Sequence, residues 1–253
     1  MNPSGNTILI TGGGSGIGRG LAESLHELGN QVIVAGRRQH ALDETTAANP
    51  GMKSLALDIE DPGAIREFAA KVAAEFPSIN ILINNAGIMR AEKLLAPQPD
   101  LGDAEAIVTT NLLGPIRLTA ALLPQIQKQS RAAIINVSSG LAFLPLALTP
   151  TYCATKAGLH SYTLSLRYQL RNTGVEVLEL IPPYVQTDLM SGADDPRAMP
   201  LKEFIAEVME ILKQQPTPPE ICVENVKRLR FAAESGKFDQ IFNGLNAAMS
   251  DSH

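Results

Sequence analysis

The sequence predicts an α/β protein built as one doubly wound parallel sheet. Short runs rich in valine, isoleucine and leucine alternate along the chain with longer stretches of helical periodicity, which is typical of β-α-β units. Most of these runs are continuously apolar, as expected for strands that helices cover on both faces. A glycine-rich segment also follows the first run and precedes the first helical stretch. These three observations indicate a parallel sheet with helices on both sides.

We place six strands along the chain, at residues 7–11, 31–35, 53–57, 79–83, 132–138 and 175–181. Helices are predicted at residues 16–28, 40–46, 62–76, 101–129 and 151–173. Gly29 and Gly174 stand where two of these helices would end, because glycine readily adopts the left-handed conformation of a C-terminal cap. We find no repeat, low-complexity tract or flexible linker, so residues 1–253 are expected to form a single domain.

Composition narrows the class of protein. The chain has 253 residues, of which 45% are hydrophobic and 19% are charged, as in ordinary globular domains. Its net charge of -5 has the wrong sign for a surface that binds nucleic acid. Cys153, Cys222 and the four histidines lack metal-ligand spacing, so we expect no metal site and reduced thiols in a cytoplasmic protein.

The sequence also gives no sign of a membrane segment. The amino terminus lacks the basic region and cleavage site of a signal peptide. No run approaches the ~20 uninterrupted apolar residues of a membrane span. We therefore expect no membrane partner.

The carboxyl-terminal part of the chain differs from the rest. Residues 191–200 are rich in Asp, Pro, Gly and Met, and residues 214–219 include three prolines, which is typical of loops. Helical periodicity returns at residues 201–213 and 220–235. We predict that residues 188–220 form a lid over a substrate and that residues 220–253 form a helical extension.

The glycine-rich segment has the pattern T-G-x-x-x-G-I-G from Thr11 to Gly18. Gly12 can make the tight turn, Gly16 lets backbone amides approach a pyrophosphate, and Gly18 lets the helix pack closely. Between a strand and a helix this pattern predicts a dinucleotide site, and the alternative is a flexible glycine loop. The residues expected to bind the cofactor here are Gly12, Gly14, Ser15, Gly16, Ile17 and Gly18.

The end of the second strand favours NADP(H) over NAD(H). A carboxylate here would bind the ribose hydroxyls of NAD, whereas this chain has Gly36 followed by Arg37 and Arg38. Guanidinium groups match the 2′-phosphate of NADP, although both arginines could simply be solvated at a strand end. Asp58 and Ile59 follow the third strand and are expected at the adenine, with a helix cap as the alternative for Asp58.

A tyrosine and a lysine lie one helical turn apart in Tyr152-Cys153-Ala154-Thr155-Lys156. A neighbouring ammonium lowers the pKa of a phenol, so Tyr152 is a candidate general acid or base near neutral pH. Ser139 follows the fifth strand, where its hydroxyl could hold a carbonyl oxygen. On its own this spacing is weak, because a solvated helix often carries both residues.

Together these motifs resemble the short-chain dehydrogenase/reductase family over about residues 5–190. The glycine turn, Asn84-Asn85-Ala86-Gly87, Asn111, Ser139 and the Tyr152-x-x-x-Lys156 pair carry the resemblance. The resemblance implies a single Rossmann domain with strand order 3-2-1-4-5-6 and a catalytic tetrad of Asn111, Ser139, Tyr152 and Lys156. It implies further cofactor contacts from Asn85, Ala86, Gly87, Tyr152 and Lys156.

Two departures from the family pattern stand at the carboxyl side. Pro182-Pro183 replaces the usual Pro-Gly after the sixth strand, which stiffens the backbone, although Val185 and Thr187 can still reach the nicotinamide. The usual seventh strand is expected to be absent and replaced by a carboxyl-terminal helix. In both features the chain resembles a smaller branch of the family, which includes the oxidoreductase encoded beside teichoic-acid D-alanylation genes.

The sequence therefore predicts an NADP(H)-preferring oxidoreductase that interconverts a small carbonyl compound and its alcohol, with Tyr152 as acid and base. The alternative is a catalytically silent NADP(H)-binding regulator, and a third class is a lyase or epimerase that uses the same tyrosine. The family resemblance also implies a homo-oligomer, with a dimer favoured.

Overall fold

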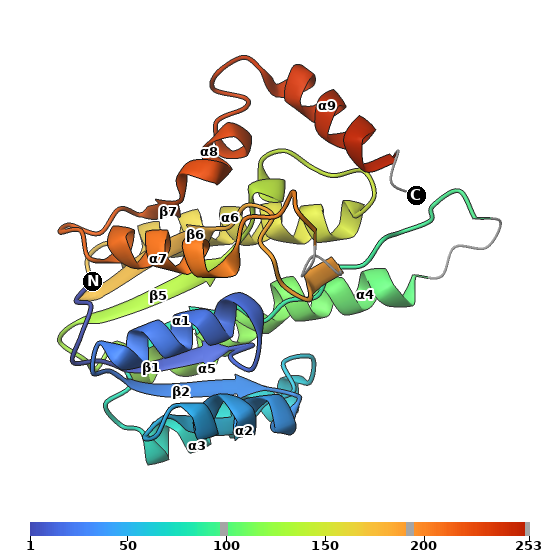
Figure 1. The fold of residues 1–253 in the computed structure, drawn as a ribbon. Coiled ribbons are helices and arrows are strands. Elements are labelled where there is room, and N and C mark those ends of the chain that lie inside the picture. Colours follow the sequence, from blue (N-terminus) through green and yellow to red (C-terminus); the bar gives the residue numbers. More distant parts are fainter. Residues whose placement is uncertain (97–100, 191–194, 251–253) are drawn as a thin grey trace.

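The computed structural model describes residues 1–96, 101–190 and 195–250. Its centre is a seven-stranded parallel sheet with the order β3-β2-β1-β4-β5-β6-β7 (Figure 1). The strands are β1 (Thr7–Thr11), β2 (Gln31–Gly36), β3 (Lys53–Ala56), β4 (Ile81–Asn84), β5 (Ala132–Val137), β6 (Val175–Ile181) and β7 (Glu220–Cys222). The predicted Rossmann order of the first six strands is thus confirmed.

Helices cover both faces of the sheet, which explains why β1, β4 and β5 are buried along their whole length. One face packs against α1 (Gly16–Glu27) and α7 (Leu201–Leu212). The other packs against α3 (Pro62–Glu75), α5 (Gly114–Ile126) and α6 (Pro150–Leu170). The remaining helices are α2 (Gln39–Ala48), α4 (Gly102–Val108), α8 (Glu224–Arg230) and α9 (Phe238–Ser250).

The seventh strand is present, so its predicted absence is wrong. β7 pairs in parallel with β6, and Glu220, Ile221 and Cys222 lie opposite Glu179, Leu180 and Ile181. Its three residues are too few to show a strand period, and the helical pattern that begins at Glu224 conceals them. The carboxyl-terminal part therefore contributes a strand to the sheet as well as α8 and α9 (red in Figure 1).

The long helix predicted at residues 101–129 is divided. A π-helical turn at Thr109–Leu113 joins α4 to α5. The stretch Gly102–Ile126 has the length and hydropathy, with a mean of 1.4 over its most apolar window, that a membrane span would need. However, Leu118, Leu122 and Ile126 of α5 lie in the core that also contains α3, which is the position of a core helix.

The segment predicted as a lid contains a packed helix. Phe204 and Val208 of α7 are fully buried in the main core, next to α1. Residues 191–194 of the predicted lid lie outside the described residues. The lid stays a prediction, and its described part beside the pocket is Asp188–Met190 together with Asp195 and Arg197.

Candidate active site

A pocket of about 770 Å³ opens at the carboxyl edge of the sheet. It extends from the glycine turn after β1 to the amino-terminal part of α6. The predicted site residues that line it are Gly12, Gly14, Ser15, Ile17, Arg37, Arg38, Ile59, Asn85, Ala86, Gly87, Ser139, Tyr152, Lys156, Val185 and Thr187. Segments far apart in the sequence meet here because parallel strands all end at the same edge.

The glycine turn has the backbone that its sequence demands. Gly12 and Gly16 have φ angles of 69° and 52°, in the left-handed region that favours glycine. A Cβ on Gly18 would lie 2.3 Å from the carbonyl oxygen of Gly12, so the first turn of α1 packs directly on the glycine turn. Gly12 and Gly14 line the pocket. Gly16 and Gly18 do not line it, and they instead allow the backbone of the turn and its close contact with α1.

A second segment supports the glycine turn from the end of β4. The Thr11 hydroxyl accepts hydrogen bonds from the backbone amides of Asn85 and Ala86, both at 3.0 Å. The Asn85 side chain donates to the Thr11 carbonyl at 2.9 Å. These bonds leave Gly87 at the pocket wall, between the turn and Lys156.

Ser139, Tyr152 and Lys156 converge on the opposite side of the pocket. Ser139 lies two residues after β5 and caps a short 3-10 turn, whereas Tyr152 and Lys156 share one face of α6. The Lys156 ammonium donates to the Val137 carbonyl at 2.8 Å and lies 5.7 Å from the centre of the Tyr152 ring. All three side chains are buried.

Burial shifts the two titratable groups of this cluster in opposite directions. It raises the pKa of Tyr152 to about 12, while the hydrogen bond to Ser139 lowers that pKa in part. Burial lowers the pKa of Lys156 to about 8, and the charge of Glu179 opposes this shift. The expected lowering of the Tyr152 pKa by the lysine is therefore not found, because burial outweighs it, and Tyr152 is a protonated phenol at neutral pH.

Asn111 lies behind the pocket in the π-helical turn between α4 and α5. Its side-chain amide accepts from the Ile88 amide at 2.9 Å and donates to the Ile88 carbonyl at 2.8 Å. A Cβ built on Gly87 would contact both Asn111 Oδ1 and Lys156 Nζ, at 3.3 and 3.6 Å. Asn111 thus holds the segment Gly87-Ile88 after β4, which lies between Asn111 and Lys156.

The two arginines predicted to contact a 2′-phosphate already have protein partners. Arg37 forms an ion pair with Glu60 at 2.7 Å, and Arg38 donates to the Ser15 hydroxyl at 2.9 Å. Both arginines are exposed and line the pocket. Asp58 is exposed and accepts from the Glu60 amide, whereas Asp61 is the N-cap of α3, so Asp58 does not form the helix cap that was the alternative. Ile59 is buried at the pocket.

The Pro182-Pro183 segment leads into a short pairing with part of the predicted lid. Val185 forms a parallel bridge with Met199, whose amide donates to the Tyr184 carbonyl at 2.8 Å. The Tyr184 hydroxyl donates to Asp195, which also pairs with Arg197. Val185, Thr187 and Tyr184 line the pocket, and the nicotinamide contacts of Val185 and Thr187 stay a prediction.

Comparison with known proteins decides the family. The model of the short chain dehydrogenase family matches residues 6–198. The chain belongs to this family. The matched stretch includes the glycine turn, Ser139, Tyr152 and Lys156 of this dehydrogenase, whose roles stay predictions.

The relatives of this short-chain dehydrogenase are named as oxidoreductases. The uncharacterized oxidoreductase DltE of Bacillus subtilis is 40% identical over 97% of this chain and 98% of its own length. The 3-oxoacyl-[acyl-carrier-protein] reductase FabG of Escherichia coli is 33% identical over 78% of this chain and 81% of its own. A crystal structure of a short chain dehydrogenase from Burkholderia cenocepacia in complex with NADP is 25% identical over 97% of this chain and 99% of its own, with a TM-score of 0.81. The chain is thus an NAD(P)-dependent oxidoreductase.

Sequence reasoning missed several residues of this dehydrogenase that shape the pocket. Leu229 of α8 and Leu245 of α9 line it, so the carboxyl-terminal helices form part of its wall. Glu92 accepts from the Thr151 amide and hydroxyl, both at 2.8 Å, and so caps α6 directly before Tyr152. No spacing in the sequence links these residues to the site, because each contact joins distant segments.

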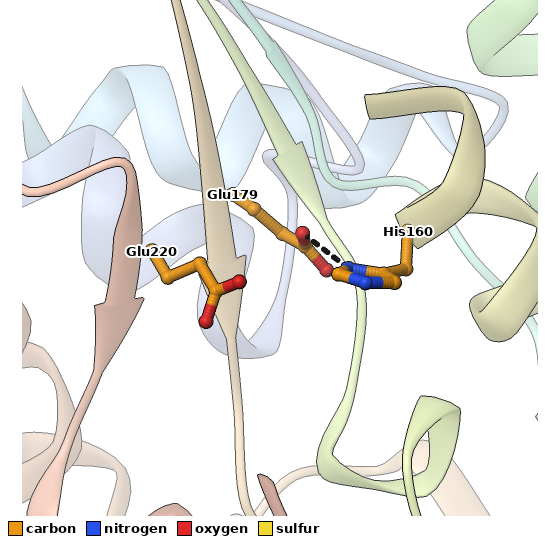
Figure 2. Close-up of side chains that lie close together, drawn as sticks. All are labelled: His160, Glu179 and Glu220. Atoms are coloured by element: carbon orange, nitrogen blue, oxygen red, sulfur yellow. Dashed lines mark hydrogen bonds and ion pairs between the residues drawn. The ribbon is translucent and has the colours of Figure 1, made fainter. Parts of the chain in front are cut away.

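A second cluster lies beside the site, formed by His160, Glu179 and Glu220 (Figure 2). One ligand atom of each lies within 4.8 Å of the others, a separation that could hold a metal ion. Both carboxylates have protein partners, since Glu179 accepts from Ser138 and His160, and Glu220 accepts twice from Arg230. These bonds account for the cluster without an ion.

Proposed function

We propose that the protein is an NADP(H)-preferring oxidoreductase that interconverts a small carbonyl compound and its alcohol. The observation that carries the proposal is the meeting of Ser139, Tyr152 and Lys156 in the same pocket as the glycine turn. The turn fits a dinucleotide, because Gly12 and Gly16 in the left-handed region lead the chain into the first turn of α1, whose backbone amides can bind a pyrophosphate.

In this proposal Tyr152 moves the proton. A bound nicotinamide cofactor supplies or accepts the hydride. Tyr152, neutral because burial raises its pKa to about 12, donates its proton to the substrate oxygen in reduction and accepts it in oxidation. Ser139 holds the same oxygen, since it already pairs with the Tyr152 hydroxyl.

The other two members of the tetrad act on the cofactor side. Lys156 would bind the ribose of the nicotinamide and favour ionisation of Tyr152 through its charge. Asn111 would keep the Ile88 backbone and the Gly87 wall in place beside Lys156. Val185 and Thr187 would contact the nicotinamide.

Preference for NADP(H) rests on Arg37 and Arg38 at the end of β2, where a carboxylate would favour NAD(H). The Arg37–Glu60 pair is half exposed, and such pairs contribute roughly 0–1 kcal/mol, so a 2′-phosphate can replace Glu60. The serine dehydrogenase complexed with NADP+, which is 29% identical over 82% of this chain, is consistent with this choice.

The substrate end of the pocket supports a small and mostly apolar molecule. It is lined by Leu141, Leu146, Leu189, Leu229 and Leu245. The polar contribution at its mouth comes from the Tyr184, Asp195 and Arg197 group. Apolar lining with a few polar groups is typical of small-molecule sites.

The test is turnover of a panel of aldehydes, ketones and alcohols with NADPH or NADP+ and with NADH or NAD+. Wild-type protein is expected to oxidise NADPH with at least one carbonyl compound. Tyr152→Phe should abolish turnover and leave NADPH affinity within a few fold, because only the proton donor is lost. Tyr162→Phe, a change of the same type on α6 next to the sheet core, should keep turnover.

NADPH binding without turnover across the panel and in cell extract would instead favour a silent binding protein. Product formed without net oxidation or reduction of the cofactor would favour a lyase or epimerase. Near-normal turnover by Tyr152→Phe would refute the proposed mechanism.

We also propose a cytoplasmic homodimer. Leu101 and Val108 at α4, with Leu164 and Tyr168 on α6, are large apolar side chains that are exposed. Apolar patches on neighbouring helices are typical of oligomer interfaces. Light scattering should give the mass of two chains for the wild type and the mass of one chain for Tyr168→Glu.

The cytoplasmic location rests on the two cysteines. Both are free thiols, consistent with a reducing compartment.

A further inference from the structure

A buried glutamate lies beside the site and outside the family motifs. Glu179 is the fifth residue of β6, and its side chain is 0% exposed. An ionised carboxylate is costly inside a protein unless its charge and its oxygens have partners. The partners of Glu179 therefore indicate what the residue does.

The Glu179 carboxylate is fixed between the two elements that carry the reactive groups. One oxygen accepts from the Ser138 hydroxyl at 2.5 Å. The other pairs with Nδ1 of His160 at 2.8 Å, the contact dashed in Figure 2. Ser138 directly precedes Ser139 at the end of β5. His160 follows Lys156 by one turn on the same face of α6.

The Lys156 ammonium lies next to both segments that hold the Glu179 carboxylate. It donates to the carbonyl of Val137, which directly precedes Ser138, and Lys156 lies one turn before His160 on α6. Lys156 is itself only 4% exposed. A buried cation and a buried anion thus lie on adjacent elements of the same core.

We propose that Glu179 is a positioning residue of the active site, whose buried charge keeps the Lys156 ammonium protonated. This inference rests on the proposed role of Lys156 in the oxidoreductase. Glu179 touches neither substrate nor cofactor in this scheme and acts through Lys156. Ser138 and His160 hold the carboxylate in place.

The electrostatics of Lys156 agree with this geometry. Burial lowers its pKa to about 8, and the charge of Glu179 is what opposes that shift among the described residues. Without Glu179 the same burial would act unopposed. The lysine would then lose its proton in the neutral range, and its attraction for the cofactor ribose and the Tyr152 phenolate would weaken.

The other charged and titratable groups around Glu179 and Lys156 are balanced. On β7, Glu220 is bound by Arg230 through contacts of 2.8 and 3.0 Å, and Arg230 also pairs with Glu234. Tyr152 and the Cys222 thiol have raised pKa values through burial and stay uncharged. Ser138 is neutral, and His160 offers Glu179 a hydrogen bond through Nδ1. The charge of Glu179 raises the pKa of both Lys156 and Cys222, and of these two only Lys156 is charged near neutral pH.

The test measures the ionisation of Lys156 directly, by NMR titration of protein labelled with 13C at the lysine ε carbon. The Lys156 signal is identified by its loss in Lys156→Arg. Glu179→Gln removes the charge and keeps the size and an oxygen that accepts from Ser138. It is expected to lower the titration midpoint of Lys156 by roughly one pH unit or more. Glu220→Gln is the matched control, the same change on the adjacent strand, and should leave the midpoint in place.

An unchanged midpoint in folded Glu179→Gln, or an equal shift in Glu220→Gln, would overturn the proposal. If Glu179→Gln does not fold, the double variant Glu179→Leu, Ser138→Ala carries the test, because apolar groups can replace a buried polar network without leaving an unpaired hydroxyl. Its midpoint should shift in the same direction. The readout needs no turnover, so a shifted midpoint in a protein without activity would refute the proposed function and leave this inference intact.

Discussion

Replacing Gly18 with alanine tests how tightly α1 packs on the glycine turn. A Cβ at this position would lie 2.3 Å from the Gly12 carbonyl oxygen and 2.4 Å from Nδ2 of Asn85. Real Cβ atoms essentially never approach closer than 3.0 Å, so the Gly12 carbonyl must move by at least 0.7 Å, from 2.3 to 3.0 Å. The same movement disturbs the bonds from Asn85 to the Thr11 and Gly12 carbonyls.

These contacts set the expected size of the effect. Overpacking of this kind costs about 1–3 kcal/mol, while alanine gains about 1 kcal/mol over glycine inside a helix. We expect the free energy of unfolding to fall by up to about 2 kcal/mol, which corresponds to a fall in Tm of up to roughly 8 °C for a chain of this size. Displacing one backbone amide from a charged phosphate costs about 1.5–3 kcal/mol, which weakens NADPH binding by roughly 10-fold to 100-fold.

The assay is NADPH fluorescence titration together with thermal unfolding. Gly244→Ala is the matched control, because it is also a glycine inside a helix, α9, and nothing lies within 4 Å of its added Cβ. The control should keep wild-type affinity and stability or gain slightly in stability. Wild-type NADPH affinity and Tm in Gly18→Ala would refute the packing argument.

The remaining predictions concern the cofactor end and the pH dependence. Arg37→Asp should shift the NADP/NAD ratio of kcat/KM toward NAD(H), because a phosphate partner is replaced by a repelling carboxylate; an unchanged ratio contradicts the assignment of Arg37. Glu60→Gln should raise that ratio by a few fold, since Glu60 competes with the phosphate for Arg37, and tighter NADH binding instead would count against it. The rate of carbonyl reduction should be constant near neutral pH and fall above about pH 8, because Lys156 then loses its proton. Tyr152 stays protonated up to about pH 12 and does not limit the rate in this range. A rate that rises through this range would contradict the roles given to the two groups.

Much of the fold could be predicted from the sequence because the strands of a parallel sheet are apolar along their whole length. The runs that became β1, β4 and β5 are buried throughout, so their hydrophobicity marks them directly. The glycine turn and the Tyr152–Lys156 pair are local motifs, in which spacing along the chain fixes the geometry. Short-range structure fixes the geometry within each motif, whereas the motifs meet in one pocket because the parallel strands all end at the same edge.

What could not be predicted depends on contacts between distant segments. β7 has only three residues, and it is a strand because Glu220, Ile221 and Cys222 meet the edge of β6. The Arg37–Glu60 pair joins the segments that follow β2 and β3. Because these segments are distant in the sequence, the sequence analysis did not predict that the Arg37 guanidinium is paired. The high pKa of Tyr152 follows from burial, whereas the sequence indicated only the neighbouring lysine.

Pro182-Pro183 and the Glu179 cluster both lie on the β6–β7 side of the sheet. Family motifs occupy the ends of β1, β4 and β5 and the start of α6, whereas Pro182-Pro183 follows β6 and Glu179 lies within it. β7 places Glu220 opposite Glu179. Arg230 of α8 binds Glu220 and lies over the ring of Phe143, which contacts His160. Burial drives the Tyr152 phenol and the Lys156 ammonium toward their neutral forms, but only the lysine comes close to losing its proton at physiological pH. The charged Glu179 therefore acts on Lys156, the group whose pKa lies nearest to neutral pH. We expect the β6–β7 edge, and not the family motifs, to set the pH range in which this dehydrogenase works.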